Sequence, residues 1–534
     1  MKKQFNNIGF FLLVLLSTAF LFSSCENETW NEHYSEDAEL VSDQTLWDVI
    51  RTNPNLKKFA WALKKTGYDK NLSNSQMYTV WAPVDSASTN NIDTTNNSVD
   101  NIILTKEYVK NHISRYKYSA SGIKSAKITL LNNKVTTFGM KGTDYYFADN
   151  RILSKNLVAS NGLLHVIGRK LPFFDNLWEY LSKDTRLDSI RTYLYSFDKI
   201  TFDPVRSTPG DVNEDGETVY IDSVLYNSNK MFSLLGKLER EDSTYTAIWP
   251  TNAAWKTSYQ KIKEYYRYYS TASTKYTADT LQRNYTRLAL VQDLVFSNTI
   301  QKNPNDSLVS TAKNVFYNPQ TLIAGAQKVT ASNGVAYITD ELKYNHWQSW
   351  NKKILVEAEK SKGRTNTWSN LYERSYSGNT YTGISGKKYI EVISSTTSVN
   401  PTVQFEIPDI LSGKMNPDKT IAYGAAYNIY CVFVPHSIRT ASPKPNKVKF
   451  SILYNGETGK VVTVNYDNNG LSYTTDKNQL TKVLIASNVT FPFSEKGLDS
   501  YSVKVKVNSN VSAKETVEFT RDLLIDCVIL EPVQ

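Results

Sequence analysis

One pair of short motifs occurs twice in this chain, in the same order and at similar spacing. In the first copy, Tyr78–Asp85 (YTVWAPVD) is followed about eighty residues later by Asn161–Ile167 (NGLLHVI). In the second copy, Tyr245–Asn252 (YTAIWPTN) is followed by Asn333–Ile338 (NGVAYI). An internal repeat constrains the domain count before any local pattern is considered. The chain is therefore predicted to contain two copies of one module.

The residues of each motif indicate what the module is built from. Thr79-Val80-Trp81 is a short apolar run that favours a strand, and Pro83 stops it because proline has no N–H to give to a sheet. Asn161-Gly162 is typical of a tight turn, and the residues from Leu163 to Ile167 then read as a buried strand. Each motif pair therefore predicts two strands of one small domain.

Both pairs resemble the two signature boxes of the fasciclin-like domain, which read like T-x-F-A-P-T-D/N-x-A-F and N-G-x-x-H-V-I-D. The first copy carries His165 in the second box and His112 in the Val109–His112 segment, where that family often has a histidine. In the second copy Tyr337 stands where the second box has histidine. The resemblance covers roughly residues 40–175 and 220–345, and it implies an α+β adhesion-type module rather than an enzyme.

His165 has two interpretations. As a functional residue it would be a ligand or a catalytic base. As a structural residue it would be a core or turn histidine whose nitrogens bind the backbone, and this second interpretation is favoured.

The first 24 residues have the pattern of a targeting segment. Lys2-Lys3 gives a positive start, and Ile8 to Phe22 is an apolar run too short for a comfortable membrane span. Phe22-Ser23-Ser24-Cys25 then resembles a bacterial lipobox, in which the cysteine becomes the lipidated N-terminus. We expect Cys25 to anchor the mature chain in a bilayer through its acyl chains, with an ordinary cleaved signal peptide as the alternative.

Glu26-Asn27-Glu28 resembles the acidic export signal of surface lipoproteins of Bacteroidota. The expected location is therefore the outer membrane, lipid-anchored and facing the cell surface, with an inward-facing periplasmic lipoprotein as the alternative.

The rest of the chain divides by pattern into further domains, since 534 residues are too many for one core. Helices are expected over Thr45–Leu63, with a break at Asn53-Pro54, over Tyr108–Tyr116 and over Thr277–Asn298. From about Ile354 the pattern changes to short strands. The predicted order is a signal peptide (1–24), anchor and tether (25–44), two α+β fasciclin-like domains (45–180 and 181–345) and an all-β jelly-roll sandwich (346–534).

The strands of that last third are predicted from apolar runs separated by turn signals. Val356-Glu357-Ala358-Glu359 near its start, and the run from Leu524 to Pro532 at its end, resemble the first and last strands of galactose-binding-like jelly rolls. The predicted strands cover Ile354–Ala358, Tyr389–Ile393, Val403–Ile407, Tyr427–Val434, Val448–Leu453 and Leu523–Leu530.

Many carbohydrate-binding modules have that fold, which implies a polysaccharide or oligosaccharide as partner. Such a site needs exposed rings that stack on sugar faces and polar groups for the hydroxyls. The candidates lie in the loop-rich stretch from Trp368 to Tyr381, namely Trp368, Tyr372, Tyr376 and Asn379. The alternative for each ring is a place in the sandwich core or at a domain interface.

Residues 211–222 carry part of the pattern of a calcium-binding loop. Asp211, Asn213 and Asp215 place oxygen donors at positions 1, 3 and 5 of an EF-hand-like loop, with Asp222 at position 12. However, the residues after the loop alternate like a strand, where an EF-hand needs a helix. An Asn/Asp/Gly-rich turn is therefore favoured, and no cofactor is expected.

The charge, the cysteines and the absence of catalytic motifs reduce the number of function classes that this sequence fits. Without Lys2 and Lys3, 59 of the 61 basic residues remain against 52 acidic ones, and no cluster indicates nucleic acid. Cys431 and Cys527 could form a disulfide or remain free thiols. No catalytic motif appears, so we expect no enzyme.

Two functions of different classes fit this sequence. The first is a surface lipoprotein that binds glycan as an accessory of an outer-membrane polysaccharide-uptake system. The second is an adhesion or scaffold lipoprotein that contacts proteins through its fasciclin-like modules.

Overall fold

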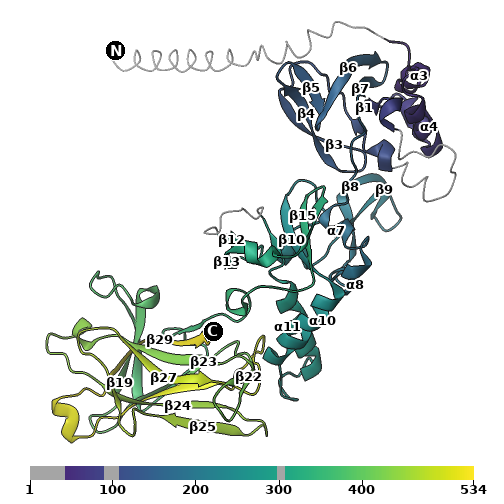
Figure 1. Ribbon diagram of the computed structural model, residues 1–534. Coiled ribbons are helices and arrows are strands. Elements are labelled where there is room, and N and C mark those ends of the chain that lie inside the picture. The colour runs from purple at the N-terminus through teal and green to yellow at the C-terminus, as the bar shows by residue number, and fades with distance from the viewer. Residues whose placement is uncertain (1–41, 89–106, 298–306) are drawn as a thin grey trace, which may run out of the picture. The chain divides into compact units, whose positions relative to one another are not determined.

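The computed structural model describes residues 42–88, 107–297 and 307–534, and the chain divides into two compact units between Asp175 and Asn176 (Figure 1). The division precedes the expected end of the first domain at residue 180. Asn176 caps helix α7 (Leu177–Tyr180), and the Leu177 N–H donates to Asn333 at 2.9 Å. Helix α7 therefore belongs to the second module. Cys25 and the expected signal segment lie outside the described residues.

The first module places its two sequence motifs side by side. Strand β1 (Tyr78–Pro83) runs parallel to β7 (Gly162–Ile167), and Tyr78 pairs with Gly162. They lie in a seven-stranded sheet with the order β2-β1-β7-β6-β5-β4-β3. Helices α3 (Leu46–Thr52) and α4 (Lys57–Thr66) precede β1 and confirm the predicted helical segment with its break. The remaining strands are β2 (Ile113–Arg115), β3 (Ser125–Thr129), β4 (Val135–Lys141), β5 (Asp144–Phe147) and β6 (Asn150–Ala159).

The second module repeats this arrangement. Strand β10 (Tyr245–Pro250) runs parallel to β15 (Gly334–Thr339), with Tyr245 opposite Gly334. The sheet order is β11-β10-β15-β14, and β8 and β9 form a separate two-stranded sheet. The other elements include α8 (Asp188–Tyr195), β8 (Ile200–Val212), β9 (Thr218–Asn227), α10 (Asn252–Ile262), α11 (Ala278–Val291), β11 (Val295–Phe296), the hairpin β12 (Ser307–Val309) and β13 (Val315–Tyr317), and β14 (Gln327–Ala331).

The glycine of the second motif has the same physical role in both modules. Gly162 has φ +149°, and a Cβ there would lie 1.9 Å from the Tyr78 carbonyl oxygen. Gly334 has φ +150°, and a Cβ there would lie 1.9 Å from the Tyr245 oxygen. A larger residue would therefore push the two parallel strands apart.

The C-terminal part forms two antiparallel sheets with an apolar layer between them. One sheet has the order β18-β19-β29-β23-β27, with β16 paired to β29, and the other has the order β17-β20-β28-β24-β25. The six predicted strands are all present. They are β16 (Ile354–Glu357), β19 (Lys388–Ser394), β20 (Thr402–Glu406), β23 (Tyr427–Phe433), β24 (Lys447–Asn455) and β29 (Leu523–Pro532), joined by β17 (Arg364–Thr367), β18 (Ser369–Ser375), β25 (Val461–Tyr466), β27 (Thr481–Val489) and β28 (Lys504–Ser509).

Two predicted helices end earlier than their patterns indicate. The helix expected over Tyr108–Tyr116 stops after residue 110, and Ile113–Arg115 forms β2. The helix expected over Thr277–Asn298 ends at Val291, and Val295–Phe296 pairs with β10. In both cases a short segment adds to a sheet edge, beside β1 and β10 respectively, and tertiary packing overrides the helical period. Among the described residues, no helix has the length and hydropathy needed to cross a membrane.

Candidate functional site

The predicted ligand-binding stretch is a strand rather than a loop over much of its length. Ser369–Ser375 forms β18, which pairs antiparallel with β19 along all seven of its residues and lies at the edge of its sheet. Leu371 packs against the sandwich core, whereas its neighbour Tyr372 is 44% exposed. Because side chains alternate across a strand, Tyr372 lies on the outer face of the sheet.

An ion cluster built around the buried Glu391 carboxylate adjoins Tyr372 on this face. Tyr372 pairs across the strands with Glu391, whose side chain is only 7% exposed and lies between two arginines. Arg374 Nη2 lies 2.7 Å from one carboxylate oxygen, and Arg439 Nε lies 2.9 Å from the other. The Arg374 guanidinium also lies 4.9 Å from the centre of the Tyr372 ring. The tyrosine ring therefore stands beside a fixed group of charges.

Trp368 is the most exposed candidate ring, with 69% of its surface accessible. It connects β17 to β18, and its backbone has the left-handed φ of +57°. This conformation is uncommon for a bulky residue. The Ser395 N–H donates to the Trp368 carbonyl at 2.9 Å, and the Asn366 amide donates to Ser369. The turn that presents the indole is thus held from both sides.

Tyr376 and Asn379 lie in the loop after β18. Unlike Trp368 and Tyr372, Tyr376 is not an exposed residue. The Tyr376 hydroxyl accepts hydrogen bonds from the N–H groups of Thr380 and Tyr381, and its ring packs against Tyr381 at 5.6 Å. Tyr376 is half-buried in a small apolar cluster. It therefore holds the loop together, and Asn379 is exposed within that loop.

The structure thus separates the four predicted residues into two places. Trp368 lies directly before the edge strand β18, and Tyr372 lies within it. Tyr376 and Asn379 lie in the loop that follows this strand. Within the described residues, no hydrogen bond or ring contact joins Trp368 to the other three. An exposed ring can stack on the C–H face of a pyranose. The arginine N–H groups that do not bind Glu391 can donate to sugar hydroxyls.

Sequence reasoning missed Arg374, Glu391 and Arg439. Only Arg374 lies close to a predicted residue in the sequence. Glu391 alternates with the apolar residues Ile390 and Val392 in β19, and a carboxylate within an apolar run is the signal that could have indicated a buried partner. Arg439 has no comparable signal, because the fold alone brings it to Glu391.

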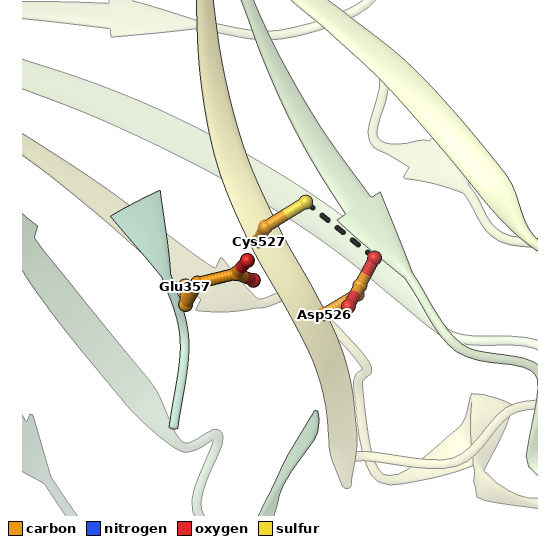
Figure 2. A group of neighbouring side chains, drawn as sticks. All are labelled: Glu357, Asp526 and Cys527. Carbon is orange, nitrogen blue, oxygen red and sulfur yellow. Dashed lines mark hydrogen bonds between the residues drawn. The ribbon is translucent and has the colours of Figure 1, made fainter. Parts of the chain in front are cut away.

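A separate group of acidic side chains lies on strands β16 and β29, in the sheet that also contains β18 and β19 (Figure 2). One ligand atom each from Glu357, Asp526 and Cys527 lies within 4.8 Å of the others. Asp526 accepts hydrogen bonds from the Ser385 N–H at 3.0 Å and from the Cys527 thiol at 3.5 Å. The Ser385 hydroxyl donates to Glu357 at 2.5 Å.

The chemistry of this acidic group favours oxygen donors. One carboxylate oxygen each of Glu357 and Glu359 is buried without a hydrogen-bond partner. Burial raises the pKa of Asp526 to about 7, and the charges of Glu357 and Glu359 add to this shift. Burial also raises the pKa of the Cys527 thiol, which keeps it protonated. These carboxylates could hold a hard cation such as Ca²⁺, which binds oxygen ligands, and a cation there would relieve the charge repulsion.

The loop considered for calcium is a hairpin turn between β8 and β9. The Asn213 side-chain oxygen accepts from the N–H groups of Asp215 at 3.1 Å and Glu217 at 2.8 Å. Strand β9 follows where an EF-hand has a helix. Asp211 and Asp222 lie in the two strands, and their side chains are not among those described. The favoured turn is therefore present, and a metal bound at Asp211, Asn213, Asp215 and Asp222 stays a prediction.

The two histidines of the first module are structural. His165 is fully buried; its Nδ1 accepts from the Asn156 N–H at 3.3 Å, and its Nε2 lies 3.0 Å from the Tyr118 carbonyl. His112 has the same kind of partners, with Nδ1 2.8 Å from the Tyr108 carbonyl and Nε2 accepting from the Leu171 N–H. Burial lowers the pKa of each histidine to about 4. Both rings are therefore neutral core residues.

Cys431 and Cys527 are free thiols. Cys431 packs into the core between the sheets, whereas Cys527 packs with Val432 and Ile529 in a separate cluster. The two side chains thus lie on opposite faces of adjacent strands, and this excludes a disulfide between them.

Comparison with known proteins identifies part of this architecture. Residues 54–172 match the Fasciclin domain family. The chain is 15% identical to the FAS1 domain pair of the insect cell adhesion molecule Fasciclin I, covering 55% of this chain and 99% of that one, with a TM-score of 0.22. It is 12% identical to the CBM22-1 xylan-binding domain of Paenibacillus barcinonensis Xyn10C, covering 34% and 94%, with a TM-score of 0.22.

A second xylan-binding domain, from CBM 22, is 14% identical over 33% of this chain and 92% of that one, with a TM-score of 0.20. No curated protein matches this chain. The predicted fold class is confirmed: two α+β fasciclin-like domains precede an all-β jelly-roll sandwich.

Proposed function

We propose that this chain is a surface lipoprotein that binds glycan through the outer face of its sandwich, as an accessory of an outer-membrane polysaccharide-uptake system. The observation that carries the proposal is the exposed ring of Tyr372 beside the Arg374–Glu391–Arg439 ion cluster, in which only Glu391 is buried. An exposed aromatic ring beside fixed hydrogen-bond donors suits a ligand with ring faces and hydroxyls.

The fixed charges make this surface suitable for recognition. Glu391 orients both arginines, so their remaining N–H groups are held in place before a ligand arrives. Pre-organised donors lose little conformational entropy on binding. A polysaccharide can then bind by stacking on Tyr372, and on Trp368 where its chain extends along the edge strand. This binding needs no cofactor and no catalytic residue.

The proposed location follows from the sequence. The apolar segment before Cys25 and the acidic residues after it suit a lipidated protein displayed on the outer membrane. In this position the chain would meet polysaccharide before uptake proteins do.

The second candidate is an adhesion or scaffold role through the fasciclin-like modules. The repeated module, and the Fasciclin domain match over residues 54–172, favour it. In this role the modules contact other proteins, and the exposed rings of the sandwich have no sugar to bind.

Affinity electrophoresis of residues 26–534, which include every described residue, against a panel of neutral and acidic polysaccharides tests the proposal. We expect one class of glycan to retard the chain. Tyr372→Ala and Trp368→Ala should weaken this retardation. The matched control is Tyr317→Ala, which removes an exposed ring (64%) from the second module. No retardation by any glycan would favour the scaffold role.

A further inference from the structure

The second module has a groove at the base of the β8–β9 hairpin, far along the chain from the sandwich surface. Its volume is about 980 Å³. Phe197 and Phe232 line one part of it, and Tyr226 at the end of β9 lines another. These rings make the lining of the groove partly apolar.

The rim of this groove is positively charged. Lys199, Lys230 and Lys237 line it and are exposed, and among the described residues no ion pair joins any of them to an acid. Lys230 lies 4.2 Å from the centre of the Phe197 ring. Glu239 is the acidic residue of the lining, and burial raises its pKa. The groove therefore favours a ligand with negative charges.

Arg240 does not add to the free positive charge. It also lines the groove, but its guanidinium forms an ion pair with Asp242. The three lysines thus carry the charge complementarity of this surface.

The hairpin beside the groove exposes large apolar side chains. Ile200 is 66% exposed, Leu225 is 61% exposed and Tyr226 is 45% exposed. Branched aliphatic groups have no flat face for a sugar ring to stack on, whereas contact with another protein buries them well. These residues favour a protein ligand over a glycan.

The hairpin also offers a strand edge. β8 and β9 pair only with each other in the part of the chain that the structure describes. Pro204 and Pro209 interrupt β8, whose register with β9 is irregular, and proline protects an edge because it has no N–H. Strand β9 contains no proline. Its outer edge can therefore accept another strand.

We infer that this groove binds an acidic, extended segment of another protein. The segment adds to the β9 edge, directs its carboxylates to Lys199, Lys230 and Lys237 on the groove side, where Tyr226 lies, and places its apolar side chains on the opposite face, against Leu225. This site does not depend on the proposed glycan function, because it uses none of the sandwich residues.

A capped ten-residue peptide of alternating valine and glutamate is the probe, and alternating valine and lysine is its matched control. Binding to residues 26–534 is measured by calorimetry. We compare Lys199→Glu/Lys230→Glu/Lys237→Glu with a charge-matched variant, Lys256→Glu/Lys261→Glu/Lys328→Glu. The latter reverses three exposed lysines of the same module outside the groove. Circular dichroism checks that both variants fold.

The expected result is that only the acidic peptide binds, and that the groove variant weakens its binding at least tenfold while the control variant changes it less than twofold. Leu225→Thr/Tyr226→Thr should weaken binding without changing the charge. The inference would be overturned if both triple Lys→Glu variants lost the same affinity for the acidic peptide, or if the acidic peptide did not bind to the unchanged chain. Polygalacturonate binding that only the groove variant loses would assign the groove to acidic glycan instead. Self-association without peptide, lost in that variant, would assign it to a second copy of this chain.

Discussion

Asn161 and Asn333 occupy the same place in the two modules and make the same set of hydrogen bonds. The Asn161 side-chain oxygen accepts from the first N–H of helix α3, at Leu46, and the Asn333 oxygen accepts from the first N–H of α7, at Leu177. Each amide nitrogen donates to two carbonyl oxygens: those of Leu72 and Asn74 in the first module, and those of Leu238 and Arg240 in the second. One side chain thus ties helix, loop and central strands together in each module.

We expect Asn161→Ala to destabilise the first unit strongly. It removes two buried hydrogen bonds and one part-buried one, and leaves the Leu46 N–H and two carbonyls without partners, which should cost about 3 kcal/mol or more. Denaturant unfolding of residues 26–534 measures this, and the transition of the second unit should not move. Asn71→Ala, an exposed substitution in helix α5 (Tyr68–Leu72), is the control. A change below about 1 kcal/mol for Asn161→Ala would contradict this role.

The first unit should lose stability in weak acid because of its buried histidines. The folded-state pKa of His112 and of His165 is about 4, whereas an unfolded histidine titrates near 6.5. Between these values the unfolded state binds more protons, so stability is complete above about pH 6.5 and falls as the pH drops toward about 4. At pH 5 the expected loss is about 2 kcal/mol per histidine.

Hydrogen exchange of strands β1 and β7, expressed as free energies of opening at pH 7 and pH 5, measures this loss. Histidine NMR titrations should show both rings neutral at pH 5. Equal opening energies at the two pH values, or titration of either ring near 6.5, would contradict the burial argument.

Asp526 should have the opposite pH dependence. Its folded-state pKa is raised to about 7, so the folded state binds a proton that the unfolded state has lost. The stabilising contribution of protonated Asp526 to the free energy of unfolding is complete below about pH 4 and is lost as the pH rises through 7. Asp526→Asn keeps an acceptor for the Ser385 N–H and removes one charge from the acidic group. The variant should therefore raise the free energy of unfolding at pH 8 by about 2 kcal/mol, and little at pH 4.

Thermal unfolding at the two pH values checks this prediction. Asp526→Asn that destabilises the sandwich at pH 8 would show that the charge is compensated.

Gly497 should be required for packing of α11 against the sandwich. A Cβ at Gly497 would lie 1.6 Å from the Tyr285 hydroxyl oxygen, whereas Gly459, with a similar φ, has no atom within 4 Å. Replacing either glycine with alanine costs the same backbone strain, because the two φ angles are similar. The difference between the two losses of stability therefore measures the steric clash with Tyr285. Gly497→Ala should therefore cost about 2 kcal/mol more than Gly459→Ala. Adding Tyr285→Ala should remove most of that difference, as measured by chemical unfolding, and failure of this rescue would contradict the account.

Much of the fold could be predicted because its signals are local or repeated. The two motif pairs predicted that β1 and β7, and β10 and β15, belong to matching modules. The apolar runs of the sandwich core predicted its buried strands. Strand β18 was missed because it lies at a sheet edge, where polar residues such as Asn370 and Glu373 interrupt the alternation that marks a buried strand.

The candidate site could be predicted only in part. Exposed aromatic residues near Trp368 and Tyr372 could be found from composition and position. Their separation from Tyr376 depends on the hydrogen bonds of one loop, which no residue pattern indicates. The meeting of Glu391 with Arg439, and of Glu357 with Asp526, depends on long-range strand pairing and on loop positions. Register sets these contacts, and register comes from packing of the whole sheet.

The most direct measurement is calorimetric titration of residues 26–534 with the polysaccharide that retards them most, comparing the unchanged chain with Tyr372→Ala and Tyr317→Ala. The account predicts that Tyr372→Ala weakens binding about five- to thirtyfold, since loss of a stacking ring costs roughly 1–2 kcal/mol, and that Tyr317→Ala leaves the affinity unchanged. Equal affinity for all three proteins would contradict a glycan site on the outer face of the sandwich.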